Sequence, residues 1–412
     1  MHGSHLPLRV LFVSHDGGMA GAQQTLLTLL EGIDREHFAP YVVVPYRGEL
    51  SIRVEKLDIP VITRELRHWV PCIAGLSHQR RLQHLWRLIP SLRSRVWAIA
   101  ALIERFRIEL VYTNTVTCIE GALAARTTNR PHVWHIHEPI KGNSELLPLL
   151  PTWIYSKVIS ILSNRVIFPS VVVSRDYPAL ADKQAIVYNG LPMPSAVDRI
   201  AAHNEVAALL GLDPTRQLVG VVGAIQPRKD HYTFVKAAEI IAKEKNDVDF
   251  VIVGSGGELH TQKIRKFVKD FGLEGRIKIP GRWPGSIQTM MAAIDVLAIS
   301  SEQESFGLTA IESMAMETPV VSTRCGGPEE IIEDNSNGFL VNRKDAKSMA
   351  EAMLKLLNEP LLARRFGAAG RIDVLKRFTQ ERYVNGVQDA MLDVCGIKSV
   401  VTNHENAGGG SI

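Results

Sequence analysis

Short apolar runs alternate with longer amphipathic segments along most of the chain. The apolar runs are rich in valine, isoleucine and leucine, as is typical of parallel strands that are buried on both faces. The segments between them carry apolar residues at helical spacing. This alternation predicts an α/β fold in which helices cover both faces of parallel sheets.

The alternating pattern occurs as two series. In the first, strands are predicted in LRVLFVS, APYVVVP, IELVYTN, PHVWHIHE, RVIFPS, VVVS and AIVYNG, and helices in AQQTLLTLLEGI and IEGALAAR. The pattern restarts after NGLPMPSAVDR, a link at residues 189–199. The second series has strands in LVGVVGAIQPRK, DFVIVGSGGE, RIKIPG, IDVLAISS, PVVSTRCGG and GFLV, and a helix in HYTFVKAAEIIAKE. We expect two doubly wound, Rossmann-like domains, residues 1–192 and 193–378, facing a central cleft where ligands bind at the carboxyl ends of the strands.

Length and composition agree with two globular domains in a reducing compartment. The chain has 412 residues, of which 46% are hydrophobic, enough for a core in each domain. Its four cysteines are far apart and form no CxxC pair, which argues against a disulfide framework or a zinc site. The amino-terminal apolar run reads as a buried strand, and no apolar stretch reaches the roughly 20 residues of a spanning helix. We expect a cytoplasmic protein, peripheral at most on the inner face of a membrane.

Positive charge is concentrated in the first half of the chain. Residues 1–195 contain 21 Lys and Arg against 15 Asp and Glu, whereas the remainder contains 26 against 28. The segment 64–107 holds nine arginines and two glutamates, interleaved with Trp69, Trp86 and Trp97. Such a segment suits an amphipathic helix at an anionic lipid surface, or a solvated helix face packed on its own domain. A nucleic-acid partner is the least favoured reading.

The stretch ESFGLTAIE, from Glu304 to Glu312, contains the first candidate chemistry. It follows a predicted strand, and a helix is expected from Gly307 to about Met316, so the amides of Ser305, Phe306 and Gly307 would lie at a helix start that attracts anions. Eight helical residues separate the two carboxylates by roughly 12 Å, beyond the roughly 5–9.5 Å of hydrolytic carboxylate pairs. The stretch suits a clamp on a diphosphate that carries a sugar at one end and a ribose at the other. Alternatively, Glu304 only interacts with the helix dipole and Glu312 is a surface residue.

The stretch also resembles a known family motif. Glu304 and Glu312 as E-x7-E, with SFG after the first glutamate and PVVSTRCGGPEEII and NGFLV downstream, resemble the donor-binding half of the retaining glycosyltransferase family 4, which has the GT-B fold. Other pieces follow in the family's order: GGMAGAQ, HIHE, VYNG, GAIQPRK and IVGSGGE. The resemblance covers nearly the whole chain except the arginine-rich segment and the tail.

The resemblance implies roles for residues of the second domain. Glu304 would contact donor-sugar hydroxyls, Glu312 the ribose, and Lys229 the charge that develops on the departing nucleotide. The diphosphate would meet the turn at the helix start, whose residues are Ser305, Phe306, Gly307 and Leu308. On the base side, the loops containing Gly254, Arg282 and Trp283 are candidates.

Residues of the first domain receive roles from the same resemblance. The glycines of the amino-terminal loop, Gly17, Gly18 and Gly21, would allow a close approach to the donor, although such a loop is also an ordinary strand-to-helix turn. His137 falls where the family has a histidine beside the reaction centre, followed here by Glu138. Because His135 lies two positions away on the same face of a strand, the assignment between the two histidines stays open.

The chain departs from the family pattern near the expected diphosphate. Ala224 stands where members commonly have an arginine, and Arg228 could supply that cation from another direction. Gln23 stands where the amino-terminal loop often has glutamate. Glu317 and Thr318 replace a glycine before PVV, which we expect to alter only a helix end.

The function implied is transfer of a sugar from a nucleotide diphosphate donor to an acceptor hydroxyl, with retention at the anomeric carbon. We expect no cofactor, and no metal because no DxD-like cluster occurs. The acceptor is expected to be a lipid-linked or growing glycan at the membrane surface, the final helix, 379–395, to return to the first domain, and residues 400–412 to form a flexible tail. A noncatalytic sugar-nucleotide-binding protein, or a GT-B epimerase or hydrolase, is the alternative. The base, the sugar, the acceptor, the linkage and the oligomeric state stay open.

Overall fold

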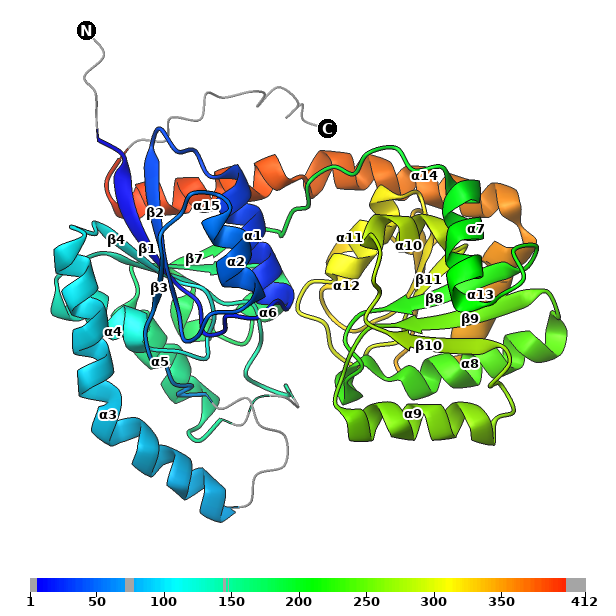
Figure 1. The fold of residues 1–412 in the computed structure, drawn as a ribbon, viewed down its shortest axis with the longest axis horizontal. Helices are drawn as coiled ribbons and strands as arrows, with labels where there is room; N and C mark the ends of the chain where they lie inside the picture. Colours follow the sequence, from blue (N-terminus) through cyan, green and yellow to red (C-terminus); the bar gives the residue numbers. More distant parts are fainter. Residues whose placement is uncertain (1–5, 71–77, 144–145, 147, 398–412) are drawn as a thin grey trace, which may run out of the picture. The chain divides into compact units, whose positions relative to one another are not determined.

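A computed structural model describes residues 6–70, 78–143, 146 and 148–397, with only the backbone described at residues 78–89. The predicted tail at 400–412 and Trp86 lie outside the described residues or side chains. The chain forms two compact units (Figure 1). The first contains Met1–Pro169, Val173–Gly190 and Gln380–Ile412, and the second contains Ser170–Val172 and Leu191–Thr379.

The first unit is built on a seven-stranded sheet whose strand pairs are all parallel. Its strands, in spatial order, are β3 (Val61–Thr63), β2 (Phe38–Val44), β1 (Leu8–Val13), β4 (Leu110–Thr113), β5 (His132–His135), β6 (Arg165–Phe168) and β7 (Gln184–Ile186). Successive side chains of a strand point to opposite faces. Val10 and Phe12 of β1 therefore enter one core, while Leu11 and Val13 enter another.

Helices cover both faces of this sheet. The helices of the first unit are α1 (Gly21–Gly32), α2 (Glu49–Glu55), α3 (His78–Arg105), α4 (Glu120–Thr127), α5 (Thr152–Leu162) and α15 (Gln380–Val394), with a 3₁₀ turn at Pro178–Leu180. Helices α1, α2 and α15 pack on the face that contains Val10, and α3 and α4 pack on the face that contains Leu11. Helix α15 contributes buried residues to the first unit's core.

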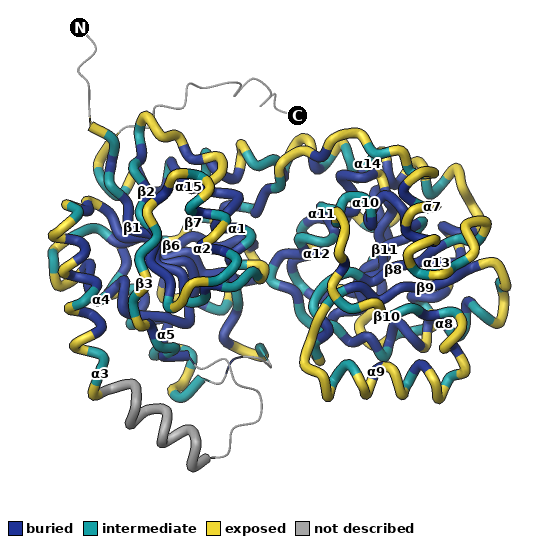
Figure 2. Tube along the Cα trace, viewed as in Figure 1, coloured by how far each residue is buried: buried dark blue, intermediate teal, exposed yellow. Residues whose placement is uncertain are grey.

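The second unit is built on a six-stranded parallel sheet. Its strands, in spatial order, are β10 (Ile277–Gly281), β9 (Val248–Val253), β8 (Gln217–Val222), β11 (Val296–Ile299), β12 (Val320–Thr323) and β13 (Gly338–Val341). Figure 2 shows that the inner strands of both sheets are buried while the outer faces of the helices are exposed; the edge strands β3, β7 and β10 are partly exposed. The predicted α/β class with two doubly wound sheets is confirmed.

The helices of the second unit are α7 (Arg199–Leu210), α8 (His231–Glu244), α9 (Glu258–Asp270), α10 (Ile287–Ala293), α11 (Leu308–Ala315), α12 (Pro328–Ile331), α13 (Ala346–Asn358) and α14 (Pro360–Arg377). Four of them begin at a residue whose side chain caps the first turn. Asp198, Asp230, Ser286 and Asp345 each accept a hydrogen bond from the first turn of α7, α8, α10 and α13, respectively. These contacts satisfy amides that would otherwise lack a partner.

The order of the strands defines where each sheet can bind a ligand. In the first unit the order reverses between β1 and β4, and in the second it reverses between β8 and β11. The loops that leave such a pair run in opposite directions and open a crevice at the carboxyl end of the sheet. Residues after these four strands are therefore the first candidates for a site.

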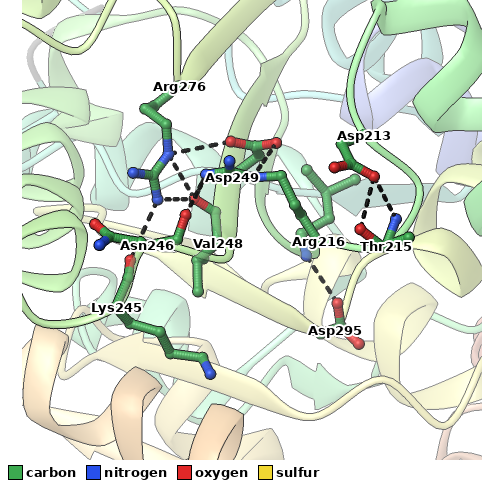
Figure 3. Close-up of polar contacts among 10 residues, drawn as sticks. Asp213, Thr215, Arg216, Lys245, Asn246, Val248, Asp249, Arg276 and Asp295 are labelled. Carbon is green, nitrogen blue, oxygen red and sulfur yellow. Dashed lines mark hydrogen bonds and ion pairs between the residues drawn. The ribbon is translucent and has the colours of Figure 1, made fainter.

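An ion-pair cluster holds together the amino ends of the strands in the second sheet (Figure 3). Buried Asp249 on β9 lies 3.0 Å from Arg216 Nε and 3.1 Å from Arg276 Nε. Arg276 Nε also donates to the Val248 carbonyl at 2.8 Å. Directly before β11, Asp295 accepts from the Leu218 amide of β8 at 2.7 Å. These contacts join the starts of β8, β9, β10 and β11, so they fix the amino ends of the strands, opposite the carboxyl ends where the crevice opens.

The sequence pattern predicted a strand in the segment VVVS, and this prediction is wrong. The segment forms a helical turn, α6 (Val171–Ser174). Consecutive valines favour strands, yet the amides of Val171 and Val172 donate to the two oxygens of Glu330 at 2.9 and 2.8 Å. A carboxylate that accepts from the first amides of a turn stabilises a helix start. Because Glu330 is remote in the sequence, the local pattern could not reveal it.

Part of the arginine-rich segment lies in the core of the first unit and not on its surface. Trp69 is buried, contacts Trp134 and Tyr155, and donates to the Val116 carbonyl at 2.6 Å. Arg95 is also buried and pairs with Glu120 at 2.8 Å. Trp97, in contrast, is 57% exposed on α3. Among the described residues, none of the helices has the length and apolar character required to span a bilayer.

Candidate functional site

The second unit gathers four polar side chains after β8 and β11, the two strands at its switch point. Lys229 Nζ donates to Glu304 Oε1 at 2.5 Å, and Ser301 Oγ donates to the same oxygen at 2.6 Å. Arg228 Nη1 lies 3.4 Å from Glu304 Oε2 and 3.3 Å from the Gln303 carbonyl. The structure therefore brings Lys229, Arg228 and Glu304 together, three residues that the sequence singled out.

The cations determine the protonation state of Glu304. Burial by itself would raise the pKa of this carboxyl, but the charges of Lys229 and Arg228, with hydrogen bonds from Lys229 and Ser301, lower the pKa below its usual value. Glu304 is consequently ionised near neutral pH. The cluster holds two cations and one carboxylate, so it keeps a net positive charge that suits a diphosphate.

Arg228 lies where it can compensate for Ala224. Ala224 follows Gly223, and a side chain built on Gly223 would come within 3.7 Å of Lys229 Nζ. The Arg228 guanidinium reaches the same carboxylate as Lys229. The second cation is thus present beside the first, supplied by the 3₁₀ turn at Pro227–Lys229.

Glu312 lies on α11, whose amino end follows β11. Burial raises the pKa of Glu312 to about 7, against the opposing effect of Lys229. The helix is preceded by Gly307, whose φ of 109° is one that a residue with a side chain rarely adopts, and no side chain caps the helix. An uncapped amino end leaves amides for an anion.

The remaining residues of the turn before α11 have mixed surroundings. The Ser305 carbonyl accepts from Ser170 Oγ at 2.6 Å. Phe306 is buried, and its ring centroid lies 5.7 Å from that of Phe378. Leu308 is the first residue of α11 and is half-buried. Phe306 therefore anchors the turn through its side chain.

The predicted base-side residues follow β9 and β10. Gly254 lies so close to β8 that a side chain there would come within 1.7 Å of the Gly223 carbonyl. Arg282 is exposed, whereas Trp283 is buried with an indole nitrogen that has no partner among the described residues. Nearby unpartnered atoms that the sequence reading missed are His231 Nδ1 and Nε2, His260 Nε2 and Gln226 Oε1. Buried polar atoms without partners are uncommon and are found where ligands bind.

The glycine loop of the first unit has a structural reason for its composition. A side chain at Gly17 would come within 2.1 Å of the Tyr46 carbonyl. The Gly18 amide donates to Asp16 Oδ1 at 2.6 Å, and the Tyr46 hydroxyl donates to the same oxygen. Gly21, the first residue of α1, has open space around its α-carbon. Close packing thus accounts for Gly17, while Gly21 leaves room beside the loop.

The histidines of HIHE lie together at the carboxyl end of β5. The ring centroids of His135 and His137 are 3.9 Å apart. His135 is fully buried and its Nδ1 lies 2.5 Å from the Tyr112 hydroxyl, whereas His137 Nε2 lies 2.8 Å from Asn114 Oδ1. His137 retains 8% exposure, whereas His135 retains none.

Burial also sets the charge of these histidines. Desolvation, with a smaller effect of His15, lowers the pKa of His137 to about 3. Desolvation and the neighbouring His137 lower the pKa of His135 well below its usual value. Both rings are neutral at pH 7, so they act as hydrogen-bonding groups and not as cations.

Sequence reasoning missed several polar residues beside His137. Asn114 follows β4, and His15 and Asp16 follow β1, which are the two strands at the first unit's switch point. His15 lies with its ring centroid 5.5 Å from that of His68. The signal that could have found them is a polar residue directly after each predicted strand on either side of the switch point.

Comparisons with known proteins agree with this architecture. Residues 204–373 match the family model "Glycosyl transferases group 1", and residues 19–193 match "Glycosyltransferase Family 4". The structure of Anabaena Alr3699/HepE in complex with UDP-glucose is similar to the chain with a TM-score of 0.75, at 20% identity, over 95% of this chain and 100% of that one. That likeness concerns the fold.

Curated relatives match over different lengths. An uncharacterized glycosyltransferase, MJ1178, of Methanocaldococcus jannaschii is 26% identical over 85% of this chain and 95% of its own. A poly(ribitol-phosphate) alpha-N-acetylglucosaminyltransferase of Staphylococcus aureus is 31% identical over 40% of this chain. The match spans only 34% of the length of that Staphylococcus protein.

Two parallel α/β units, each with polar residues at its switch point, define a protein of the GT-B fold. The two family models together span most of the chain. The chain belongs to the glycosyltransferase group 1 / family 4 proteins, as the resemblance of its motifs predicted.

Proposed function

We propose that this protein is a retaining glycosyltransferase that moves a sugar from a uridine diphosphate sugar to an acceptor hydroxyl. The observation that carries the proposal is the cluster of Lys229, Arg228 and Glu304 beside the uncapped amino end of α11. A net positive cluster at a helix start suits the diphosphate of a sugar nucleotide. The choice of uridine is supported by the solved Anabaena relative, whose structure contains UDP-glucose.

In this proposal the second unit stabilises the leaving group. Lys229 and Arg228 neutralise the charge that develops on the nucleotide diphosphate, together with the amides of the turn at Ser305, Phe306, Gly307 and Leu308. Binding of the diphosphate competes for the two cations that pair with Glu304. The Glu304 carboxylate is then available to accept hydrogen bonds from sugar hydroxyls, and Glu312 accepts from the ribose.

The first unit supplies the acceptor side. His137 contacts a sugar hydroxyl near the reaction centre, and Gly17, Gly18 and Gly21 admit the substrate beside the amino-terminal loop. The leaving phosphate itself takes the proton of the acceptor hydroxyl, which gives retention without an enzymic nucleophile. No metal ion is needed, because the two cations and the helix start provide the positive charge.

A thermal-shift and turnover screen over UDP-, GDP- and ADP-sugars tests the donor and the reaction. We expect stabilisation and transfer with UDP-sugars, an α-configured product by NMR from an α-linked donor, and turnover that survives EDTA. Glu304→Gln should reduce kcat about a hundred- to a thousandfold. Its matched control is Glu302→Gln, which removes a neighbouring carboxylate that pairs instead with Lys344 at 3.2 Å.

Each alternative function predicts a distinct outcome of that screen. A noncatalytic sugar-nucleotide-binding protein would bind the UDP-sugar without turnover, and its function would survive Glu304→Gln. An epimerase or a hydrolase would convert the donor with no acceptor present. Either result would overturn the proposed transfer.

We further propose that the acceptor is a lipid-linked or growing glycan met at an anionic membrane surface. Exposed Arg93 and Trp97 of α3 support this, because a tryptophan beside arginines suits a phospholipid headgroup region. Flotation with vesicles that contain anionic lipid should recover the protein, and Trp97→Ala should weaken recovery. Equal flotation with neutral and anionic vesicles would contradict the proposal.

A further inference from the structure

Asn114 is a fully buried amide whose side chain is hydrogen-bonded at both ends. Its Nδ2 donates to the Ala22 carbonyl at 2.9 Å, and its Oδ1 lies 2.8 Å from His137 Nε2. Its backbone amide donates to the Val13 carbonyl at 2.9 Å. Contacts with β1, the first turn of α1 and His137 in the loop after β5 therefore hold Asn114 in place.

These contacts allow one orientation of the Asn114 amide. A carbonyl oxygen accepts hydrogen bonds and cannot donate them, so the group that faces the Ala22 carbonyl must be the NH₂ group. The reverse orientation would place two acceptor oxygens against each other. Asn114 Oδ1 therefore faces His137 as an acceptor, and His137 Nε2 must carry the hydrogen.

The position of that hydrogen determines which nitrogen of the His137 ring can accept a hydrogen bond. Because burial keeps His137 neutral, the ring holds a single N–H hydrogen, which Asn114 places on Nε2. Nδ1 then carries a lone pair. Within the described part of the chain, Nδ1 has no hydrogen-bond partner, and it is not among the polar atoms shut off from solvent.

We propose that Asn114 is a positioning residue that holds His137 in the Nε2–H tautomer, so that Nδ1 accepts a hydrogen bond from a sugar hydroxyl of the bound substrates. The inference rests on the proposed glycosyltransferase function, in which His137 contacts substrate. The opposite tautomer would present an N–H group to that hydroxyl and would lack the lone pair. Asn114 thus selects which chemistry the ring offers to the substrate.

Other titratable groups lie next to His137 or next to its neighbours. His15 and His135 interact with His137 itself, and Glu138 is the next residue. Asp16 lies beside His15, and Tyr112 and Tyr383 lie beside His135. Desolvation, with the charge of His68, lowers the pKa of His15 to about 4. Both tyrosines have pKa values raised by burial. The histidines and tyrosines of this group therefore stay neutral between pH 6 and 8.

Two substitutions of Asn114 distinguish an effect on the His137 tautomer from an effect on the fold. Asn114→Leu removes both hydrogen bonds at similar size and should lower kcat roughly ten- to a hundredfold with donor KM unchanged within about twofold. Asn114→Asp keeps an acceptor but places a carboxylate beside His137, which raises the pKa of the histidine. Protonated His137 has no lone pair, so the rate of this variant should fall as the pH decreases and recover as it rises. At saturating donor, where the pH dependence of donor affinity through Glu312 does not contribute, the wild-type kcat should lack that limb.

The tautomer can also be read directly in the full-length protein. Long-range proton–nitrogen NMR correlation on ¹⁵N-histidine-labelled protein distinguishes the two neutral tautomers, and the His137 signal is the one missing from His137→Gln. We expect Nε2–H in the wild type and loss of that preference in Asn114→Leu. Thr28→Val is the matched control, because it removes another buried hydrogen bond in the first unit, to the Gln24 carbonyl at 3.0 Å.

The outcomes separate this inference from the proposed function. An Nδ1–H or charged His137 in the wild type, or an Asn114→Leu variant with turnover within twofold of wild type, would overturn the positioning role. Absence of turnover with every donor would instead overturn the proposed function, while the NMR spectrum would still decide the tautomer. Where Asn114→Leu does not fold, the wild-type spectrum and the pH profile of Asn114→Asp decide it.

Discussion

At the scale of single residues, the cluster of Lys229, Arg228 and Glu304 in the second unit bears on the departure of this chain from the family motif. The family pattern has an arginine where this chain has Ala224, yet Arg228 and Lys229 both reach Glu304. Arg228 therefore places a second cation beside Lys229 on the same loop, and we propose that it takes the part of the missing arginine. The two carboxylates of the motif also differ in charge, since Glu304 is held ionised and Glu312 titrates near neutral pH.

Arg228 should be exchangeable with an arginine at position 224. Arg228→Ala removes one charge-assisted contact with the diphosphate, so the donor KM should rise about tenfold. Adding Ala224→Arg to that variant should recover part of the loss. Steady-state kinetics with a UDP-sugar checks both. The control is Lys243→Ala, which removes an exposed cation of α8 that pairs with Glu239; an equal loss in this control would mean that net charge alone matters.

Donor binding should depend on pH through Glu312. A pKa of about 7 means that roughly nine-tenths of this carboxyl is protonated at pH 6, and a protonated acid accepts poorly from the ribose. Affinity for a UDP-sugar should therefore rise up to about tenfold from pH 6 to pH 8, with proton release on binding. Calorimetry in buffers of different ionisation enthalpy measures both quantities, and Glu312→Gln should flatten the dependence.

The raised pKa of Glu312 also makes the stability of the ligand-free protein depend on pH, in a direction that follows from the pKa. The unfolded chain releases this proton near pH 4.5, whereas the folded protein keeps it until about pH 7. The folded state binds more protons in that window, so the contribution of Glu312 to stability falls as the pH rises through it. A contribution that rises with pH, measured against Glu312→Gln, would contradict the assignment.

At the scale of helices and strands, the sequence pattern predicted the two sheets because their strands are short apolar runs that continue into polar turns. It failed where a distant residue determines the local structure. VVVS became helical because Glu330 accepts from its first amides, and Trp69 joined the core by packing on Trp134. Helix α7 was missed because its apolar periodicity is weak, although Asp198 marks its start.

The candidate site was predictable to the same extent. Lys229, Glu304 and Glu312 belong to segments with recognisable motifs and could be found from the sequence. Asn114 lies at the end of a predicted strand, so its position was visible in the sequence, but its contacts with Ala22 and His137 depend on the strand order and were not.

Helices α3 and α4 are joined by a buried ion pair that should dominate their stability. Arg95 and Glu120 are almost completely buried, 2.8 Å apart. Glu120→Ala would leave Arg95 buried without a counter-charge, which should cost about 3–5 kcal/mol of unfolding free energy. The double variant Arg95→Met/Glu120→Leu should lose much less, because it removes both charges. Urea denaturation checks this, and a double variant less stable than the single one would contradict it.

At the scale of the whole molecule, the chain leaves the first unit and returns to it. After the second unit is complete, α15 contributes Tyr383, Val384, Val387 and Met391 to the core around α1 and β1. Gln388 accepts from the Asp34 amide at 2.7 Å, and Gln380 donates to the Thr28 carbonyl at 2.8 Å. The first unit thus depends on residues from both ends of the sequence.

In a chain that stops after Thr379, the second unit should fold stably and the first unit should be destabilised. Without α15, the apolar face of α1 and β1 is exposed to water, which destabilises the first unit. Limited proteolysis should then degrade residues 1–169 and leave a resistant fragment that begins near residue 191. Equal resistance of both parts would show that α15 is dispensable for the first unit.

The return of α15 has a consequence for how the protein emerges from the ribosome. Domains usually fold in the order in which they are synthesised, but here the part made first lacks a piece of its own core until the last helix leaves the exit tunnel. The second unit, which is continuous apart from Ser170–Val172, can fold earlier. The nascent first unit must therefore keep the apolar surface of α1 out of aggregates throughout the synthesis of the second, a period in which a chaperone has an obvious place to bind.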